Sequence, residues 1–217
     1  MTLAGASSIA EFDSGRAKQI GTLSDPGEYP AACAVDPTSG RIAVTNYLAA
    51  GGGRGSVSVY ENASSTPKIY IDKRIYAYQF CAYDSKGNLY IDGLHTLKSG
   101  FEFAELPHGG KHFEKLNLGA EIKFAGALLW DGKDIALADP KAKAIDRIAD
   151  GRIVSQVRLD HYLGSDFFIA NGEIGTVMPL TRGPMQFWKY PKGGKLARSF
   201  LLNLQPDDIP IFVAATE

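Results

Sequence analysis

The side chains that could carry out chemistry are few and scattered along the chain. Asp207 and Asp208 are adjacent carboxylates, but neighbouring residues on a strand point to opposite faces, which argues against paired acid–base catalysis. The four histidines show no spacing typical of a metal site. The sequence has no Gly-x-Ser-x-Gly elbow, and its glycine-rich loop 49–55 lacks the Lys-Ser/Thr of a phosphate-binding loop. The sequence therefore predicts no catalytic residue.

Cys33 and Cys81 are the two cysteines of the chain, and each stands three residues before an aspartate, Asp36 or Asp84. One interpretation is that both are small buried apolar residues. The other is a disulfide between adjacent strands, which needs an oxidising compartment and Cα atoms within about 7 Å. Two cysteines alone do not supply a zinc site. Both interpretations stay open at the level of sequence.

The candidate residues lie on or beside predicted β-strands. Between Tyr29 and Asp72, the segments 41–46 and 56–60 alternate polar and apolar residues, with the period of two that is typical of a strand. An apolar segment precedes them and Lys68–Asp72 follows, with Gly-, Ser- and Pro-containing turns between the segments. This stretch predicts four antiparallel strands joined by short turns, which is one blade of a propeller.

Looser copies of this unit fill the rest of the chain. The third strand, with its turn and fourth strand, recurs five times, with starts 41 to 48 residues apart at Ser8, Ser56, Phe101, Ala144 and Met185. This interval is close to the ~40–50 residues of propeller repeats. The first two strands recur as well, joined by turns at Asp36, Asp84, Asp131 and Asn171.

These repeats predict an all-β chain, with residues 1–217 forming a single β-propeller domain of five four-stranded blades. We expect the C-terminal segment Ile209–Thr216 to pair with the N-terminal strands and close the ring, with Thr2–Ala6 as a strand of the closing blade. One alternative is a six-bladed parent truncated at its N-terminus; another is a solenoid or sandwich built from the same strands. Residues 138–148 alternate as a strand does, which argues against a helix there.

Composition limits the classes of function. The 217 residues are 45% hydrophobic and 22% charged, with a net charge of −1 that is spread without blocks. These values predict a folded domain with no basic stripe for nucleic acid and no apolar run that could span a membrane. We also expect a monomer. The first 13 residues lack the features of a signal peptide. The protein is therefore either cytoplasmic, or exported (periplasmic or extracellular) with its signal removed.

Two resemblances rest on short motifs. Ala34-Val35-Asp36-Pro37 with 40–44, and Tyr83–Tyr90, resemble NHL-repeat and YVTN-type bacterial propellers. This resemblance implies blade geometry, and similar propellers are often exported, lipoprotein-like proteins of uncharacterised role. Gly27-Glu28-Tyr29-Pro30 is distantly similar to the metal-binding Glu-x-Pro of the gluconolactonase/regucalcin propellers. That similarity implies calcium or another divalent cation at Glu28, and Asp166 as the catalytic aspartate. At the place of that family's asparagine ligand stands Lys123, which would repel a cation.

The first strands are expected to enter a central channel from one face, where the long loops 48–55 and 92–100 also lie. Tyrosines and charges of both signs at this mouth suit a polar ligand, although such residues can also simply fill and solvate a channel. We predict a non-catalytic binding or interaction propeller without a cofactor, whose partner is an unknown small molecule or protein. The alternative is a metal-dependent hydrolase or lactonase that uses Glu28 and Asp166 in the channel. The predicted ligand-binding residues are Tyr29, Tyr78, Lys123, Asp166, Asp208 and His95.

Overall fold

The computed structural model describes residues 2–3, 8–13, 18–25, 28–61, 66–124, 126–161, 164, 166–176 and 184–201. The chain divides into two compact units, Met1–Leu118 and Gly119–Glu217. Every regular element in the described residues is a β-strand, and each strand pairs antiparallel with the strand next to it in sequence. Accordingly, the described residues contain no helix that could cross a membrane.

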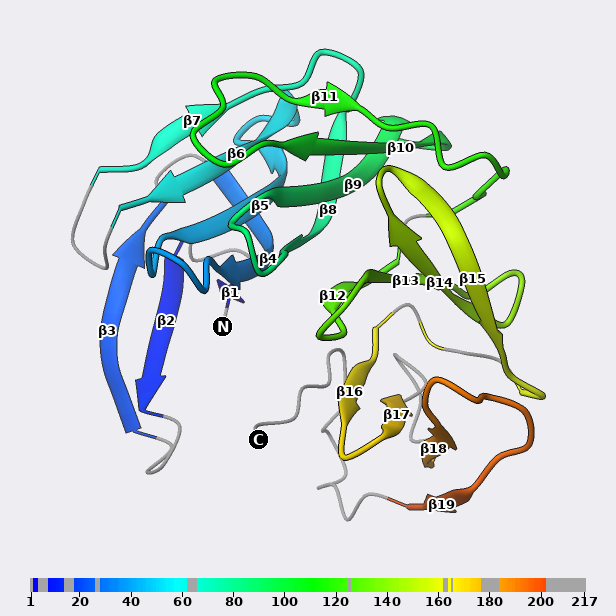
Figure 1. Ribbon diagram of the computed structural model, residues 1–217. Helices are drawn as coiled ribbons and strands as arrows, with labels where there is room; N and C mark the ends of the chain where they lie inside the picture. Colours follow the sequence, from blue (N-terminus) through cyan, green and yellow to red (C-terminus); the bar gives the residue numbers. More distant parts are fainter. Residues whose placement is uncertain are drawn as a thin grey trace. The chain divides into compact units, whose positions relative to one another are not determined.

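The first unit contains three sheets (Figure 1). The first sheet has three strands, β1 (Thr2–Leu3), β2 (Ser8–Asp13) and β3 (Lys18–Ser24). The second has four, β4 (Glu28–Val35), β5 (Ile42–Ala49), β6 (Arg54–Tyr60) and β7 (Lys68–Tyr70). The third also has four, β8 (Ala77–Tyr83), β9 (Leu89–Thr96), β10 (Ser99–Leu106) and β11 (Glu114–Lys115).

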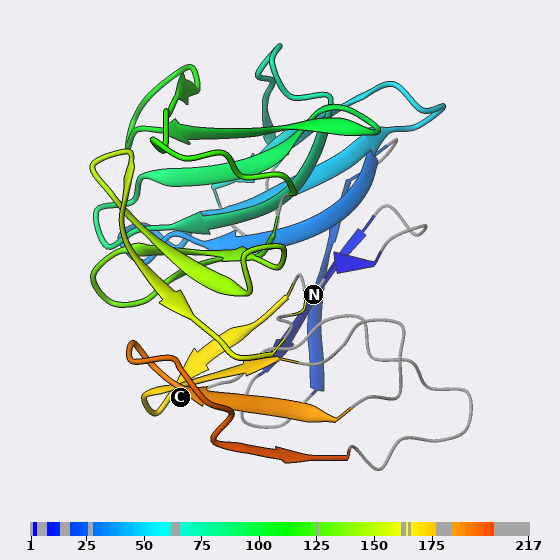
Figure 2. The same ribbon diagram turned by 90° about the vertical axis from the view of Figure 1, so that its right-hand side faces the viewer.

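The second unit contains two four-stranded sheets, the second of which runs from yellow to red-orange in Figure 2. One is formed by β12 (Leu128–Trp130), β13 (Ile135–Asp139), β14 (Ala144–Ala149) and β15 (Arg152–Arg158). The other is formed by β16 (Phe168–Ala170), β17 (Glu173–Thr176), β18 (Met185–Lys189) and β19 (Arg198–Phe200).

These sheets confirm the strands predicted from the repeats. The stretch from Tyr29 to Asp72 forms β4 to β7, and residues 138–148 contribute to strands β13 and β14 rather than to a helix. Thr2 pairs with Ile9, so the N-terminal segment does supply a strand to the first sheet. The segment Ile209–Thr216 lies outside the described residues. Closure of the ring and the choice between five and six blades therefore stay predictions.

The turns that join the first and second strands of the second and third sheets are held by hydrogen bonds to the predicted aspartates, Asp36 and Asp84. Asp36 accepts hydrogen bonds from the backbone N–H of Thr38 (2.8 Å) and the hydroxyl of Ser39 (2.6 Å), and its carbonyl accepts the N–H of Gly40. Gly40 has a φ of 74°, in the left-handed region that glycine adopts without strain. Asp84 closes the corresponding turn of the third sheet in the same way, through the N–H groups of Lys86 and Asn88.

Strands β4 and β8, which begin the second and third sheets, are irregular. Side chains on their neighbours β5 and β9 accept hydrogen bonds from their backbones. Register shifts interrupt β4 between Glu28 and Ala32, and β8 between Tyr78 and Cys81. Thr45 on β5 accepts the backbone N–H of Ala32 (3.1 Å), and Asp92 on β9 accepts that of Phe80 (2.9 Å). These contacts satisfy backbone donors that a bulge leaves without a ladder partner.

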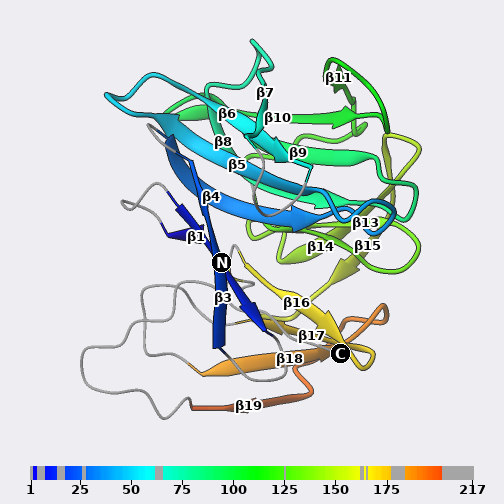
Figure 3. The same cartoon turned by 90° about the vertical axis from the view of Figure 1, so that its left-hand side faces the viewer.

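Two apolar cores join the three sheets of the first unit. Strand β8 packs against β4 and β5 (Figure 3), and residues such as Ala43, Tyr78 and Ile91 are buried between these sheets. A smaller cluster, with Ile9 and Val44 among its members, lies between the first and second sheets. The second sheet is therefore covered on both faces, which is why every residue of β6 after Arg54 is buried.

Candidate functional site

Tyr76 connects two β-hairpins of the first unit. Its carbonyl accepts the N–H of Gly55 (2.9 Å) from the β5–β6 hairpin, and its N–H donates to the carbonyl of Leu94 (2.8 Å) near the end of β9. The phenol hydroxyl donates to the carbonyl of Gly52 (2.9 Å) at the tip of the first hairpin. The guanidinium of Arg54 lies 5.4 Å from the centre of the Tyr76 ring, within cation–π range. Tyr76 thus links the β5–β6 hairpin to strand β9.

A groove of about 370 Å³ opens beside this tyrosine. We name it the Tyr76 groove; its lining residues are Tyr76, His95, Thr96, Leu97 and Lys98. Its surface is mostly apolar, and Leu97 leaves 48% of its surface exposed. Its size falls in the range of ~300–1,000 Å³ that is usual for small-molecule sites.

The polar groups of the Tyr76 groove include one cation and no carboxylate. His95 Nδ1 lies 2.9 Å from the carbonyl oxygen of Arg74. Because a carbonyl only accepts, Nδ1 carries the proton, and the neutral ring presents Nε2 as an acceptor. Lys98 is exposed, and none of the five lining residues is a carboxylate. The groove therefore offers an apolar floor with positive charge at its edge.

The predicted ligand residues of the first unit divide into two groups. His95 lines the groove, and Tyr29 is 44% exposed on β4. Tyr78 is completely buried, and its hydroxyl donates to the carbonyl of Asp72 (3.0 Å) and accepts the N–H of the same residue. Burial raises the pKa of Tyr78 to about 12. The structure therefore corrects the prediction for Tyr78: it is a core residue, while Tyr76, just outside the strand, lies at the surface.

The other predicted ligand residues belong to the second unit or lie outside the described residues. Lys123 is exposed and pairs with Glu121 (3.6 Å) ahead of β12. Asp166 precedes β16; its Oδ1 accepts the N–H of Phe167, and its carbonyl accepts the hydroxyl of Thr176 (2.7 Å). Asp208 is not among the described residues. A mouth shared by both units, and a metal held by Glu28 and Asp166, stay predictions.

Comparisons with known proteins identify the fold. No family model and no curated protein matches the sequence. A chain of a nidogen/laminin complex matches with a TM-score of 0.58 and 10% identity, over 93% of this chain and 92% of that one. A streptogramin B lyase matches with a TM-score of 0.66 and 11% identity, over 98% of this chain and 67% of that one. Both neighbours are propellers. The chain is a β-propeller.

This assignment makes the solenoid or sandwich alternative wrong and confirms the predicted all-β propeller class. At 10 and 11% identity, the two neighbours show the fold of the propeller and nothing about its ligand.

Both cysteines of the propeller are free thiols, which corrects the disulfide interpretation. Cys81 is buried against the second sheet, with its Sγ 4.0 Å from the carbonyl oxygen of Ala43. Cys33 occupies the equivalent place on β4 but is exposed, so the interpretation of two buried cysteines holds for Cys81 alone. Burial, with a smaller contribution from Cys33, raises the pKa of the Cys81 thiol.

We expect the two thiols to react at very different rates with iodoacetamide. The thiolate is the reactive form, and Cys81 is both covered and disfavoured from ionising. In the native propeller at pH 8, Cys33 should be alkylated at least about tenfold faster than Cys81, as measured by peptide mass spectrometry. In guanidinium chloride the rates should become similar. Equal rates in the native protein, or a mass two hydrogens lower with neither thiol reactive, would contradict this assignment.

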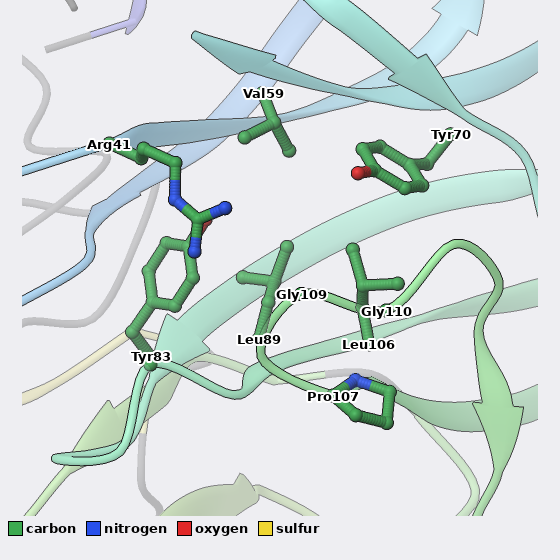
Figure 4. Close-up of a pocket in the computed structure, with 10 residues that line it drawn as sticks. Arg41, Val59, Tyr70, Tyr83, Leu89, Leu106, Pro107, Gly109 and Gly110 are labelled. Carbon is green, nitrogen blue, oxygen red and sulfur yellow. The ribbon is translucent and has the colours of Figure 1, made fainter. Parts of the chain in front are cut away.

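A small cavity lies between the second and third sheets of the propeller (Figure 4). Val59, Leu89 and Leu106 converge on it, and the guanidinium of Arg41 lies beside the Tyr83 ring at its edge. Its volume is about 20 Å³, which suits a single water molecule rather than a ligand. This cavity therefore belongs to the packing of the two sheets.

Proposed function

We propose that this propeller is a non-catalytic binding module and that the Tyr76 groove is its recognition surface. The observation that carries the proposal is the junction at Tyr76 beside an open apolar groove. Two hydrogen bonds join Tyr76 to the β5–β6 hairpin near its tip, and a third joins it to Leu94 on β9. A site that is already ordered binds at a lower entropic cost than one that must be ordered by its ligand. Rigid scaffolds commonly place their binding residues on such loops.

The lining residues favour a ligand with an aromatic or apolar body and one anionic group. Tyr76 and Leu97 provide apolar contact area, while Lys98 and the nearby Arg54 provide positive charge. His95 adds a ring nitrogen that accepts a hydrogen bond in its neutral form. A small aromatic carboxylate, or the same groups in a peptide segment, combines these features.

Indole-3-propionate is a simple probe of this chemistry, with indole-3-propionamide as its uncharged counterpart. We expect the carboxylate to shift the backbone amide resonances of residues 52–55, 76 and 94–98 in an NMR titration, and the amide to bind more weakly. Lys98→Glu should weaken binding of the carboxylate about tenfold, because it replaces an attraction at the groove with a repulsion.

Lys86→Glu is the matched control, since Lys86 is exposed at the turn that precedes β9, on the same sheet but away from the groove lining. This variant should bind the probe as the wild type does. Shifts confined to other parts of the chain, or equal affinities of the Lys98→Glu and wild-type proteins, would show that the Tyr76 groove is not the recognition surface.

A further inference from the structure

A polar cluster is buried between the first and second sheets, next to their apolar contact. On the face of the second sheet turned to the first, Val44 and Tyr60 are apolar, whereas Asn46, Ser56 and Ser58 are polar. Val44 pairs with Ser58, and Asn46 pairs with Ser56, so these side chains share one face. Two acidic residues join this face from the chain between the sheets, Asp25 just after β3 and Glu28 at the start of β4.

Hydrogen bonds connect the cluster into one chain of contacts. Asn46 Nδ2 donates to the hydroxyls of Ser56 (3.1 Å) and Ser58 (3.0 Å). The Ser58 hydroxyl donates to Asp25 Oδ1 (3.0 Å). The Ser56 side chain also forms a hydrogen bond with Glu28. The positions of these oxygen atoms are therefore fixed by the two strands and by their mutual contacts.

Two oxygens of the cluster accept no hydrogen bond. They are Asp25 Oδ2 and Asn46 Oδ1, on side chains that are 2% and 0% exposed. A buried acceptor without a donor is costly, and a buried charge without a partner is more costly still. Within the described residues, Asp25 forms no ion pair with a lysine or arginine.

The two carboxyl groups lie close enough for the charge of Asp25 to act on Glu28. Two carboxylates that repel each other in a buried site are stabilised by a cation that both can approach.

We propose that this cluster binds a calcium ion through Asp25 Oδ2 and Asn46 Oδ1, with Glu28 and the serine hydroxyls contributing further oxygen ligands. All of these donors are oxygens, the ligand type that hard divalent cations prefer. Calcium accepts six to eight oxygens in flexible geometry, whereas magnesium demands a regular octahedron and retains several waters. A buried set of carboxylate, amide and hydroxyl oxygens suits calcium better.

This site differs from the pair Glu28 and Asp166, because all of its residues belong to the first unit. The ion would connect the segment between the sheets to β5 and β6. Its role is therefore structural, and it is independent of the Tyr76 groove. Failure of the calcium site would leave the proposed recognition surface untouched.

The test is calcium-dependent stability of the full chain. After treatment with EDTA and dialysis, 1 mM calcium chloride should raise the Tm by several degrees, whereas magnesium chloride or sodium chloride of equal ionic strength should have little effect. Terbium, which replaces calcium in oxygen sites, should show luminescence sensitised by the buried Tyr60 beside Asp25, and calcium should displace it. Equal responses to magnesium and calcium, or no calcium response, would overturn the proposal.

Three variants assign the effect to the cluster. Asp25→Asn should abolish the calcium response, and Asn46→Asp, which adds a charged ligand, should bind calcium at least as tightly as the wild type. Asp146→Asn is the matched control: Asp146 is also fully buried, also has one oxygen without a hydrogen-bond donor, and lies in the second unit. It should keep the wild-type response. A calcium shift that survives in Asp25→Asn, or one lost in Asp146→Asn, would exclude the proposed site.

Discussion

Asp36→Ala is expected to lower the free energy of unfolding by about 3 kcal/mol. The carboxylate of Asp36 is fully buried. It forms an ion pair with the guanidinium of Arg41 (2.9 Å) and accepts hydrogen bonds from Thr38 and Ser39. Alanine would remove these acceptors and leave Arg41, whose side chain is 20% exposed, without its carboxylate partner. The loss should be visible in urea-induced unfolding followed by circular dichroism.

Asp84→Ala is the matched comparison, since Asp84 occupies the same turn position in the third sheet. Its carboxylate accepts hydrogen bonds from Lys86 and Asn88, and the described residues give it no arginine partner. Removing the Asp84 carboxylate leaves no arginine without its partner, so we expect the free energy of unfolding to fall by only about 1–2 kcal/mol. Equal losses at the two positions would show that the Arg41 pair contributes nothing beyond the turn.

The effect of Asp36 should also depend on pH. Burial alone would raise the pKa of Asp36, but hydrogen bonds from Ser39, Thr38 and Arg41 lower it well below its usual value. A carboxyl group whose pKa is lower in the folded state stabilises the fold above its unfolded pKa of about 3.9, and this contribution is lost as the pH falls further. The difference in stability between wild type and Asp36→Ala should therefore be full at pH 7 and shrink below pH 4.

The sequence was sufficient for features that depend on neighbouring residues. The turn at Asp36 needs an acceptor, two hydroxyl residues and a glycine within five positions, and all of these are visible in the sequence. The strands of the stretch 29–72 follow from alternation together with the turn residues between the segments, and the structure confirms them. The predicted long loop 48–55 coincides with the tip of the β5–β6 hairpin, between Ala49 and Arg54. The predicted loop 92–100 is mostly strand, because β9 extends to Thr96 and β10 begins at Ser99.

Features that depend on packing between sheets could not be predicted in the same way. The alternation in Ser56–Tyr60 indicates one buried face and one solvated face, but β6 lies between two sheets and is buried on both. Ser56 and Ser58 therefore belong to a buried polar cluster, which alternation along the strand does not predict. Similarly, the sequence pattern does not distinguish Tyr76 from Tyr78. Tyr78 is buried by packing in the folded protein, whereas Tyr76 lines the groove.

Trp188→Ala is expected to lower the free energy of unfolding by about 4 kcal/mol, within the range for a buried tryptophan. Trp188 is fully buried on β18, where it pairs with the equally buried Ile174 of β17. Its indole Nε1–H donates to Asp160 Oδ1 (2.9 Å), an oxygen that also accepts the N–H of Leu196 (3.0 Å). One side chain thus fills the core of the last sheet and fixes the connection that precedes this sheet.

Trp188→Phe separates these two roles, because phenylalanine keeps an aromatic ring in the core but cannot donate to Asp160. We expect it to cost about 1–2 kcal/mol, the loss of one hydrogen bond to a charged group with a small change in volume. Both Trp188 variants are compared with the wild type by urea-induced unfolding followed by circular dichroism. The chain has two tryptophans, so in a Trp130→Phe protein Trp188 is the remaining one, and it should show blue-shifted emission when folded. If Trp188→Phe cost as much as Trp188→Ala, the hydrogen bond to Asp160, rather than burial of the indole, would be the main source of stability here.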